Sequence, residues 1–106
     1  MGWRAFSMGS SLGKVGSAGG VIVADEDYDE AARITLERAT AVAPFAITCG
    51  VSGWLVHTRF FESEAQATSQ FEAMKVALAR MTQAAGQSND PSLTGRLAQE
   101  FVEAFP

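Results

Sequence analysis

The chain has 106 residues, of which 47% are hydrophobic and 19% are charged, and its net charge is −4. This length and composition are typical of one globular domain with a modest core. The acidic balance, without a basic stripe, argues against nucleic acid as a partner, and no apolar run is long enough to span a membrane. A single cysteine, Cys49, cannot form an internal disulfide. This fits a reducing compartment, so we expect a soluble cytoplasmic protein.

Residues 1–19 are dominated by glycine and serine. Such a composition predicts a flexible leader, so we place the single domain at residues 20–106. Gly13-Lys14 is reminiscent of a phosphate-binding loop, but Met8 and Val15 stand where that motif requires a glycine and a hydroxyl.

Residues 20–24 form a short apolar, β-branched run that predicts a strand. The acidic run that follows, residues 25–30, begins like a calcium-binding loop. Glu30 and Leu36, however, stand where that loop requires glycine and glutamate. We therefore expect a solvated acidic turn or the start of a helix.

Residues 31–42, AARITLERATAV, permit two interpretations. Alternation of apolar and polar side chains from Arg33 to Glu37 favours a strand, whereas the alanines favour a helix. A strand leads to an antiparallel β-meander with helices on one face. A helix leads to a β-α-β-β-α order, which resembles a ferredoxin-like order without its final strand. We favour the strand.

Residues 44–61 predict a β-hairpin, because two β-branched and aromatic runs flank Gly50-Val51-Ser52-Gly53. If the turn centres on Val51-Ser52, Cys49 lies opposite Trp54. The expected core face then holds Phe45, Ile47, Cys49, Trp54, Val56, Thr58 and Phe60. The other face would hold Ala46, Thr48, Leu55, His57, Arg59 and Phe61. This division separates Cys49 from His57 and so argues against a thiolate–imidazole pair.

Residues 63–85 predict a long amphipathic helix. Ser63 and Gln66 make a capping box. One apolar stripe consists of Ala67, Phe71, Met74, Leu78 and Met81. A second, short helix is expected after Pro91, with a stripe of Leu93, Leu97, Phe101 and Phe105.

The expected fold is therefore α+β, with about four antiparallel strands covered on one face by a long helix and a short terminal helix. On the non-core face of this sheet, the candidate ligand-binding residues are Arg33, Glu37, Thr48, His57 and Arg59. A guanidinium suits a small anionic ligand, and an imidazole moves protons near neutral pH. No spacing of ligands predicts a metal site, and no motif predicts a cofactor.

We expect a small binding or interaction domain that forms a homodimer, because symmetric dimers are common and open sheet edges need covering. The alternative is a small enzyme or ligand-binding protein that uses His57 and Arg59.

Overall fold

A computed structural model describes residues 2–106 of the chain. Its five strands are β1 (Trp3–Ala5), β2 (Val21–Tyr28), β3 (Ala32–Arg38), β4 (Phe45–Val51) and β5 (Leu55–Phe61). The 3-10 turn η1 (Phe6–Gly9) follows β1, and the helices α1 (Glu64–Gly86) and α2 (Leu93–Ala104) follow β5.

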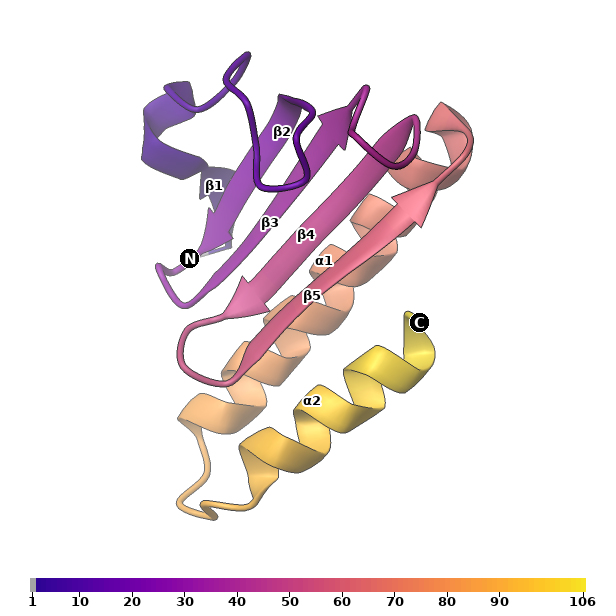
Figure 1. Cartoon of the computed structure of the whole chain (residues 1–106). Helices are drawn as coiled ribbons and strands as arrows, with labels where there is room; N and C mark the ends of the chain where they lie inside the picture. Colours follow the sequence, from indigo (N-terminus) through magenta and orange to yellow (C-terminus); the bar gives the residue numbers. More distant parts are fainter. Residues whose placement is uncertain (1) are drawn as a thin grey trace.

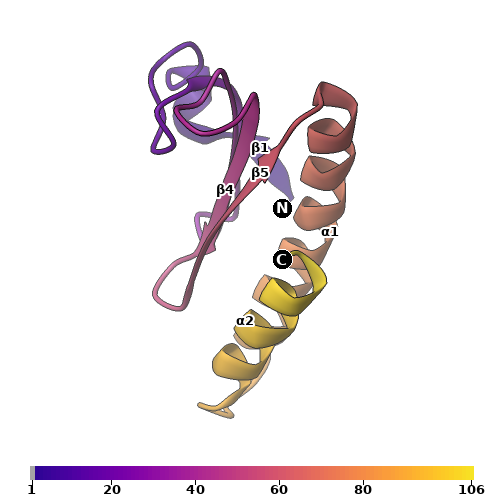
Figure 2. The same ribbon diagram turned by 45° about the vertical axis from the view of Figure 1, so that its right-hand side comes forward.

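The strands form one antiparallel sheet in the order β1-β2-β3-β4-β5, so each strand lies beside its neighbour in the sequence (Figure 1). The long helix α1 packs across one side of this sheet, and α2 lies beside α1 on the same side (Figure 2). The predicted α+β class, an antiparallel meander covered by a long and a short helix, is confirmed. The sheet has five strands rather than about four, because the short β1 pairs with β2.

The segment with two interpretations contains a strand, β3. Ile34 and Leu36 are buried in the core under α1, while Thr35 and Glu37 are buried on the opposite side of the sheet. Side chains alternate between the two faces of a strand, and here both faces of β3 are covered, one by α1 and the other by the N-terminal segment. The ferredoxin-like order, which needs a helix at this point, is therefore wrong.

Prediction and structure agree closely for α1. The side chain of Ser63 accepts a hydrogen bond from the backbone N–H of Gln66 at 3.2 Å. The buried residues of the helix are those of the predicted stripe, Ala67, Phe71, Met74, Leu78 and Met81. Each large apolar side chain removed from water here contributes about 1.5–3 kcal/mol, which fastens the helix to the sheet.

The predicted register of the hairpin between β4 and β5 is wrong. Val51 pairs with Leu55, and Cys49 pairs with His57 instead of Trp54. The turn contains three residues, Ser52, Gly53 and Trp54, with Gly53 at a φ of 88°. The partner of Cys49 is therefore three residues further along the chain than predicted. Because three is an odd number, every side chain of β5 lies on the opposite face of the sheet from the predicted one.

Residues 2–19, which were expected to be a flexible leader, lie against the sheet in this structure. β1 pairs with the last residues of β2. At the start of β2, the N–H of Gly13 donates to the carbonyl of Ile22, and the N–H of Ile22 donates to the carbonyl of Lys14, both at 2.9 Å. The segment thus covers the outer edge of β2. The mobility expected of it, and the domain boundary at residue 20, stay predictions.

Candidate functional site

The sheet has two faces: the helix face, packed against α1, and the open face on the opposite side. One row across the open face consists of Asp25, Thr35, Thr48 and Thr58, and the next consists of Asp27, Arg33, Gly50 and Val56. Arg33, Glu37 and Thr48 lie on the open face, as expected. His57 and Arg59 lie on the helix face. The structure therefore does not bring the five predicted site residues together.

Arg33 is held by Asp25 on the open face. Its Nε donates to Oδ1 at 2.9 Å and its Nη2 donates to Oδ2 at 2.6 Å, while the Thr35 hydroxyl donates to Oδ1 at 3.0 Å. The guanidinium also stacks on the ring of Phe6, 3.5 Å from its centroid. Burial raises the pKa of the Asp25 carboxyl, but the hydrogen bond and charge of Arg33 and the nearby hydroxyls of Ser11 and Thr35 lower it, and the net pKa shift is downward. The charge of Arg33 is therefore already neutralised.

Glu37 is fully buried beneath residues 16–20. Its carboxylate accepts hydrogen bonds from the backbone N–H of Gly20 at 2.9 Å and of Ala18 at 3.2 Å. Gly16 passes so close that a Cβ there would lie 2.4 Å from Cδ of Glu37. These contacts make Glu37 the residue that fastens the N-terminal segment to the open face.

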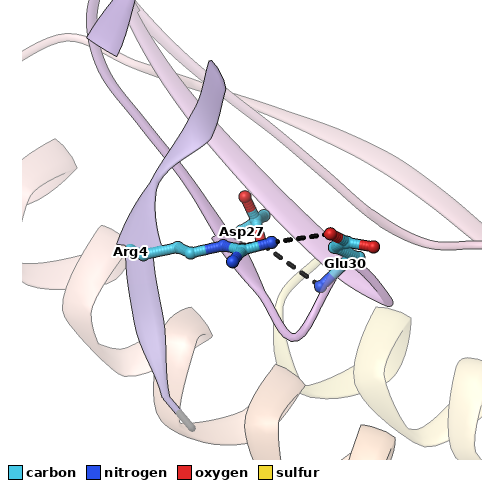
Figure 3. A network of polar contacts seen from close by, with 3 residues as sticks. All are labelled: Arg4, Asp27 and Glu30. Carbon is cyan, nitrogen blue, oxygen red and sulfur yellow. Dashed lines mark hydrogen bonds and ion pairs between the residues drawn. The ribbon is translucent and has the colours of Figure 1, made fainter. Parts of the chain in front are cut away.

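A second polar cluster joins β1 to the turn between β2 and β3 (Figure 3). Arg4 donates from Nε to Asp27 at 3.1 Å and from Nη2 to Glu30 at 3.0 Å, and the backbone N–H of Glu30 donates to Asp27 at 3.2 Å. Arg4 and Glu30 are largely exposed, so solvent screens these ion pairs and they contribute little to stability. Both carboxylates beside the open face are thus paired.

A groove of about 940 Å³ opens between the N-terminal segment and the β4–β5 hairpin. Gly50 lines the floor of the groove between Arg33 and Val56, where a Cβ would lie 2.7 Å from the carbonyl oxygen of Leu55. Val15 lines one side of the groove, and Trp54 lines the hairpin end. No local sequence pattern indicates this groove, because one of its walls comes from a segment that was expected to be flexible.

His57 and Arg59 hold the helices in place on the helix face. Nε2 of His57 lies 2.5 Å from the carbonyl oxygen of Phe105, a contact in which the ring nitrogen donates. Arg59 donates from Nη1 to the side chain of Gln70 at 2.6 Å and from Nε to the main-chain oxygen of Pro106 at 3.1 Å. Arg59 therefore connects β5 to α1 and to Pro106, and His57 connects β5 to the end of α2.

Cys49 is the cross-strand neighbour of His57, but it does not have the properties of a nucleophile. It is buried on the helix face, and burial raises the pKa of its thiol to about 12, although the charge of Arg59 acts in the opposite direction. Within residues 2–106 no hydrogen bond joins its sulfur to the imidazole. The expected separation of the two residues is wrong, yet the thiol remains protonated and inert.

Over the same described range, no group of three or more histidine, cysteine, aspartate or glutamate side chains is arranged to hold a metal ion. None of the helices described is long and apolar enough to cross a membrane. Comparisons with protein-family models, curated proteins and solved structures found no match. The function has therefore to be argued from the surfaces and side chains described above.

Proposed function

We propose that the protein is a small, non-enzymatic interaction domain that forms a homodimer through the outer edge of β5. The observation that carries this proposal is the contrast between the two edges of the sheet. β1 is only three residues long, and the edge of β2 beyond it is covered by residues 13–15. β5 is seven residues long, and no other segment of residues 2–106 pairs with its outer side.

β5 has few of the features by which natural sheets keep an edge strand from pairing, and its one inward-pointing charge, Arg59, is bonded to α1. The strand contains no proline or lysine, and its pairing with β4 is continuous, without a bulge. On the open face its side chains are Val56, Thr58 and Phe60; Val56 is 83% exposed and Phe60 is 47% exposed. An open strand with exposed apolar side chains favours the addition of another strand, and a second copy of the chain is the partner that we propose.

The side chains of the helix face support a structural role for this domain over a catalytic one. His57 and Arg59 are engaged by the ends of the helices, and the Cys49 thiol is protonated. The single buried cysteine also supports our proposal of a cytoplasmic location.

Sedimentation velocity tests the proposal. We expect a dimer at about 10–100 µM, the range suited to a modest interface. The double variant Val56→Lys/Phe60→Lys places two charges on each open edge and should weaken association at least tenfold, about 1.4 kcal/mol. The control is Val42→Lys, which introduces one lysine away from the edge, at a valine that is 75% exposed in the loop between β3 and β4. A monomeric wild-type protein at 100 µM would overturn the proposal.

The open-face groove favours a second candidate function, the binding of a small molecule. The charged side chains beside it are paired: Arg33 with Asp25, and Asp27 and Glu30 with Arg4. These pairings favour an uncharged ligand over the anionic ligand expected from the sequence.

Isothermal titration with 2-naphthol, and with the anionic 2-naphthoate as its counterpart, tests this candidate. Thr48 lines the groove, and its hydroxyl lies 3.2 Å from that of Thr58. Thr48→Val removes this polar group at nearly constant volume and should weaken 2-naphthol binding by roughly three- to tenfold. The matched control is Thr68→Val, at an exposed position of α1. Equal binding of both naphthalenes, or no effect of Thr48→Val, would contradict the assignment.

A further inference from the structure

The outer strand β5 has a side-chain pattern that is symmetric about Thr58. On the open face, Val56 and Phe60 flank it at equal spacing, and both are apolar and exposed. At the two ends of the strand, Leu55 and Phe61 are both buried on the helix face. A strand that pairs with a copy of itself about a two-fold axis places residues at equal distances from the axis opposite each other. The pattern about Thr58 therefore meets the requirement for pairing of β5 with a second copy of itself.

Only a few registers are compatible with one continuous sheet whose helices all lie on the same side. Open-face residues must then oppose open-face residues, so the axis has to pass through a residue of β5. An axis at Arg59 places two guanidinium groups opposite each other, which is unfavourable. An axis at His57 leaves Phe60 and Phe61 without opposing strand residues. An axis at Thr58 pairs all seven residues of both strands and sets Val56 opposite Phe60 of the second copy.

We propose that two copies join β5 to β5 in antiparallel fashion about a two-fold axis at Thr58, which makes one ten-stranded sheet from two five-stranded sheets. This inference rests on the proposed self-association and specifies its register. Val56 of each copy packs on Phe60 of the other, and the two Thr58 hydroxyls face each other. The open-face row that contains Thr35, Thr48 and Thr58 then continues from one copy into the next.

Disulfide cross-linking tests this register directly. The background is Cys49→Ala, which leaves one thiol in each single-cysteine variant. Residues directly opposite in an antiparallel pair have Cα atoms about 4.5–5.5 Å apart, within the range of a disulfide. Thr58→Cys should therefore give a covalent dimer on mild oxidation. Val56→Cys alone should not, because its two copies are offset by four residues, roughly 13 Å along the strand.

A mixture of Val56→Cys and Phe60→Cys proteins should cross-link as a heterodimer, which tests the same register without the Thr58 variant. Ser69→Cys, exposed on α1, measures cross-linking by random collision, and we expect at least a tenfold excess of the Thr58→Cys product over it. A dimer in sedimentation without this excess, in both the Thr58 variant and the mixture, overturns the register but leaves self-association standing. A wild-type monomer at 100 µM overturns both.

Discussion

At Gly16 there is no room for a Cβ between the N-terminal segment and the buried carboxylate of Glu37, and Gly16→Ala tests the importance of this close approach. The Cβ of an alanine would lie 2.4 Å from Cδ and 2.6 and 2.7 Å from the two oxygens. Non-bonded carbon atoms need about 3.5 Å, so the segment or the Glu37 carboxylate has to move by roughly 1 Å. The chain has no positive φ at this position, so the expected effect is steric.

A movement of this size breaks the hydrogen bonds that Glu37 accepts from Ala18 and Gly20, which measure 3.2 and 2.9 Å. A hydrogen bond to a charged group contributes about 1.5–3 kcal/mol. Detachment of the segment also lets water reach the carboxylate and compensates for part of the loss. We therefore expect the free energy of unfolding to fall by about 2–4 kcal/mol, and the Tm by about 10–20 °C in a domain of this size.

Thermal unfolding followed by circular dichroism measures the change, and trypsin cleavage after Lys14 reports whether the segment has detached. The matched control is Gly95→Ala in α2, where a Cβ meets nothing within 4 Å. This control should be as stable as the wild type or more stable by up to about 1 kcal/mol. If Gly16→Ala kept the wild-type Tm and cleavage rate, the contact with Glu37 would not hold the segment to the sheet.

Three further outcomes follow from the polar contacts. The Cys49 thiol, with its pKa raised to about 12, should resist Ellman's reagent at pH 8 until urea unfolds the protein. The stability that the protonated thiol contributes is complete below about pH 8.5 and falls by about 1.4 kcal/mol per pH unit as the pH rises. Cys49→Ala should reduce this loss of stability at alkaline pH. Fast labelling of the thiol without urea would contradict its burial and protonation. Arg33→Met leaves the buried Asp25 without its cation and should lower stability at pH 7 by about 2–3 kcal/mol. Because the pKa of Asp25 is lowered in the folded protein, the difference in unfolding free energy between this variant and the wild type should shrink below about pH 4. Urea titrations measure it, and a difference that does not change with pH would exclude this explanation. His57→Ala removes the hydrogen bond to Phe105 and should lower stability by about 1–2 kcal/mol and speed hydrogen exchange in α2; unchanged exchange would mean that His57 does not anchor this end of the chain.

Local sequence patterns were sufficient to predict the type of an element and, for α1, the side of the helix that is buried. The stripe from Ala67 to Met81 defines the buried side of α1 without reference to any other part of the chain, because helical periodicity alone sets it. The alternation from Arg33 to Glu37 likewise favoured a strand, and both of its sides proved to be covered. Glycines at positions 50 and 53 located the hairpin turn, although they did not reveal its length.

The site could not be predicted in the same way, because it depends on how elements meet. A turn of two residues and a turn of three residues fit the glycines at 50 and 53 equally well, yet they send His57 and Arg59 to opposite faces of the sheet. Glu37 was expected to be a candidate ligand-binding residue on the non-core face, and only the segment that folds over it explains its burial. Composition alone carries no information about such long-range contacts.

The amino-acid sequence by itself determined the class of the fold, the order of its main strands and helices, and the side of α1 that is buried, since these depend on periodicity and local propensity. Only the tertiary structure decided the register of β5, the placement of residues 2–19 on the sheet, and the strand edge that is left uncovered. Those features depend on contacts between residues far apart in the chain, whose free energies become available only when the whole domain is assembled.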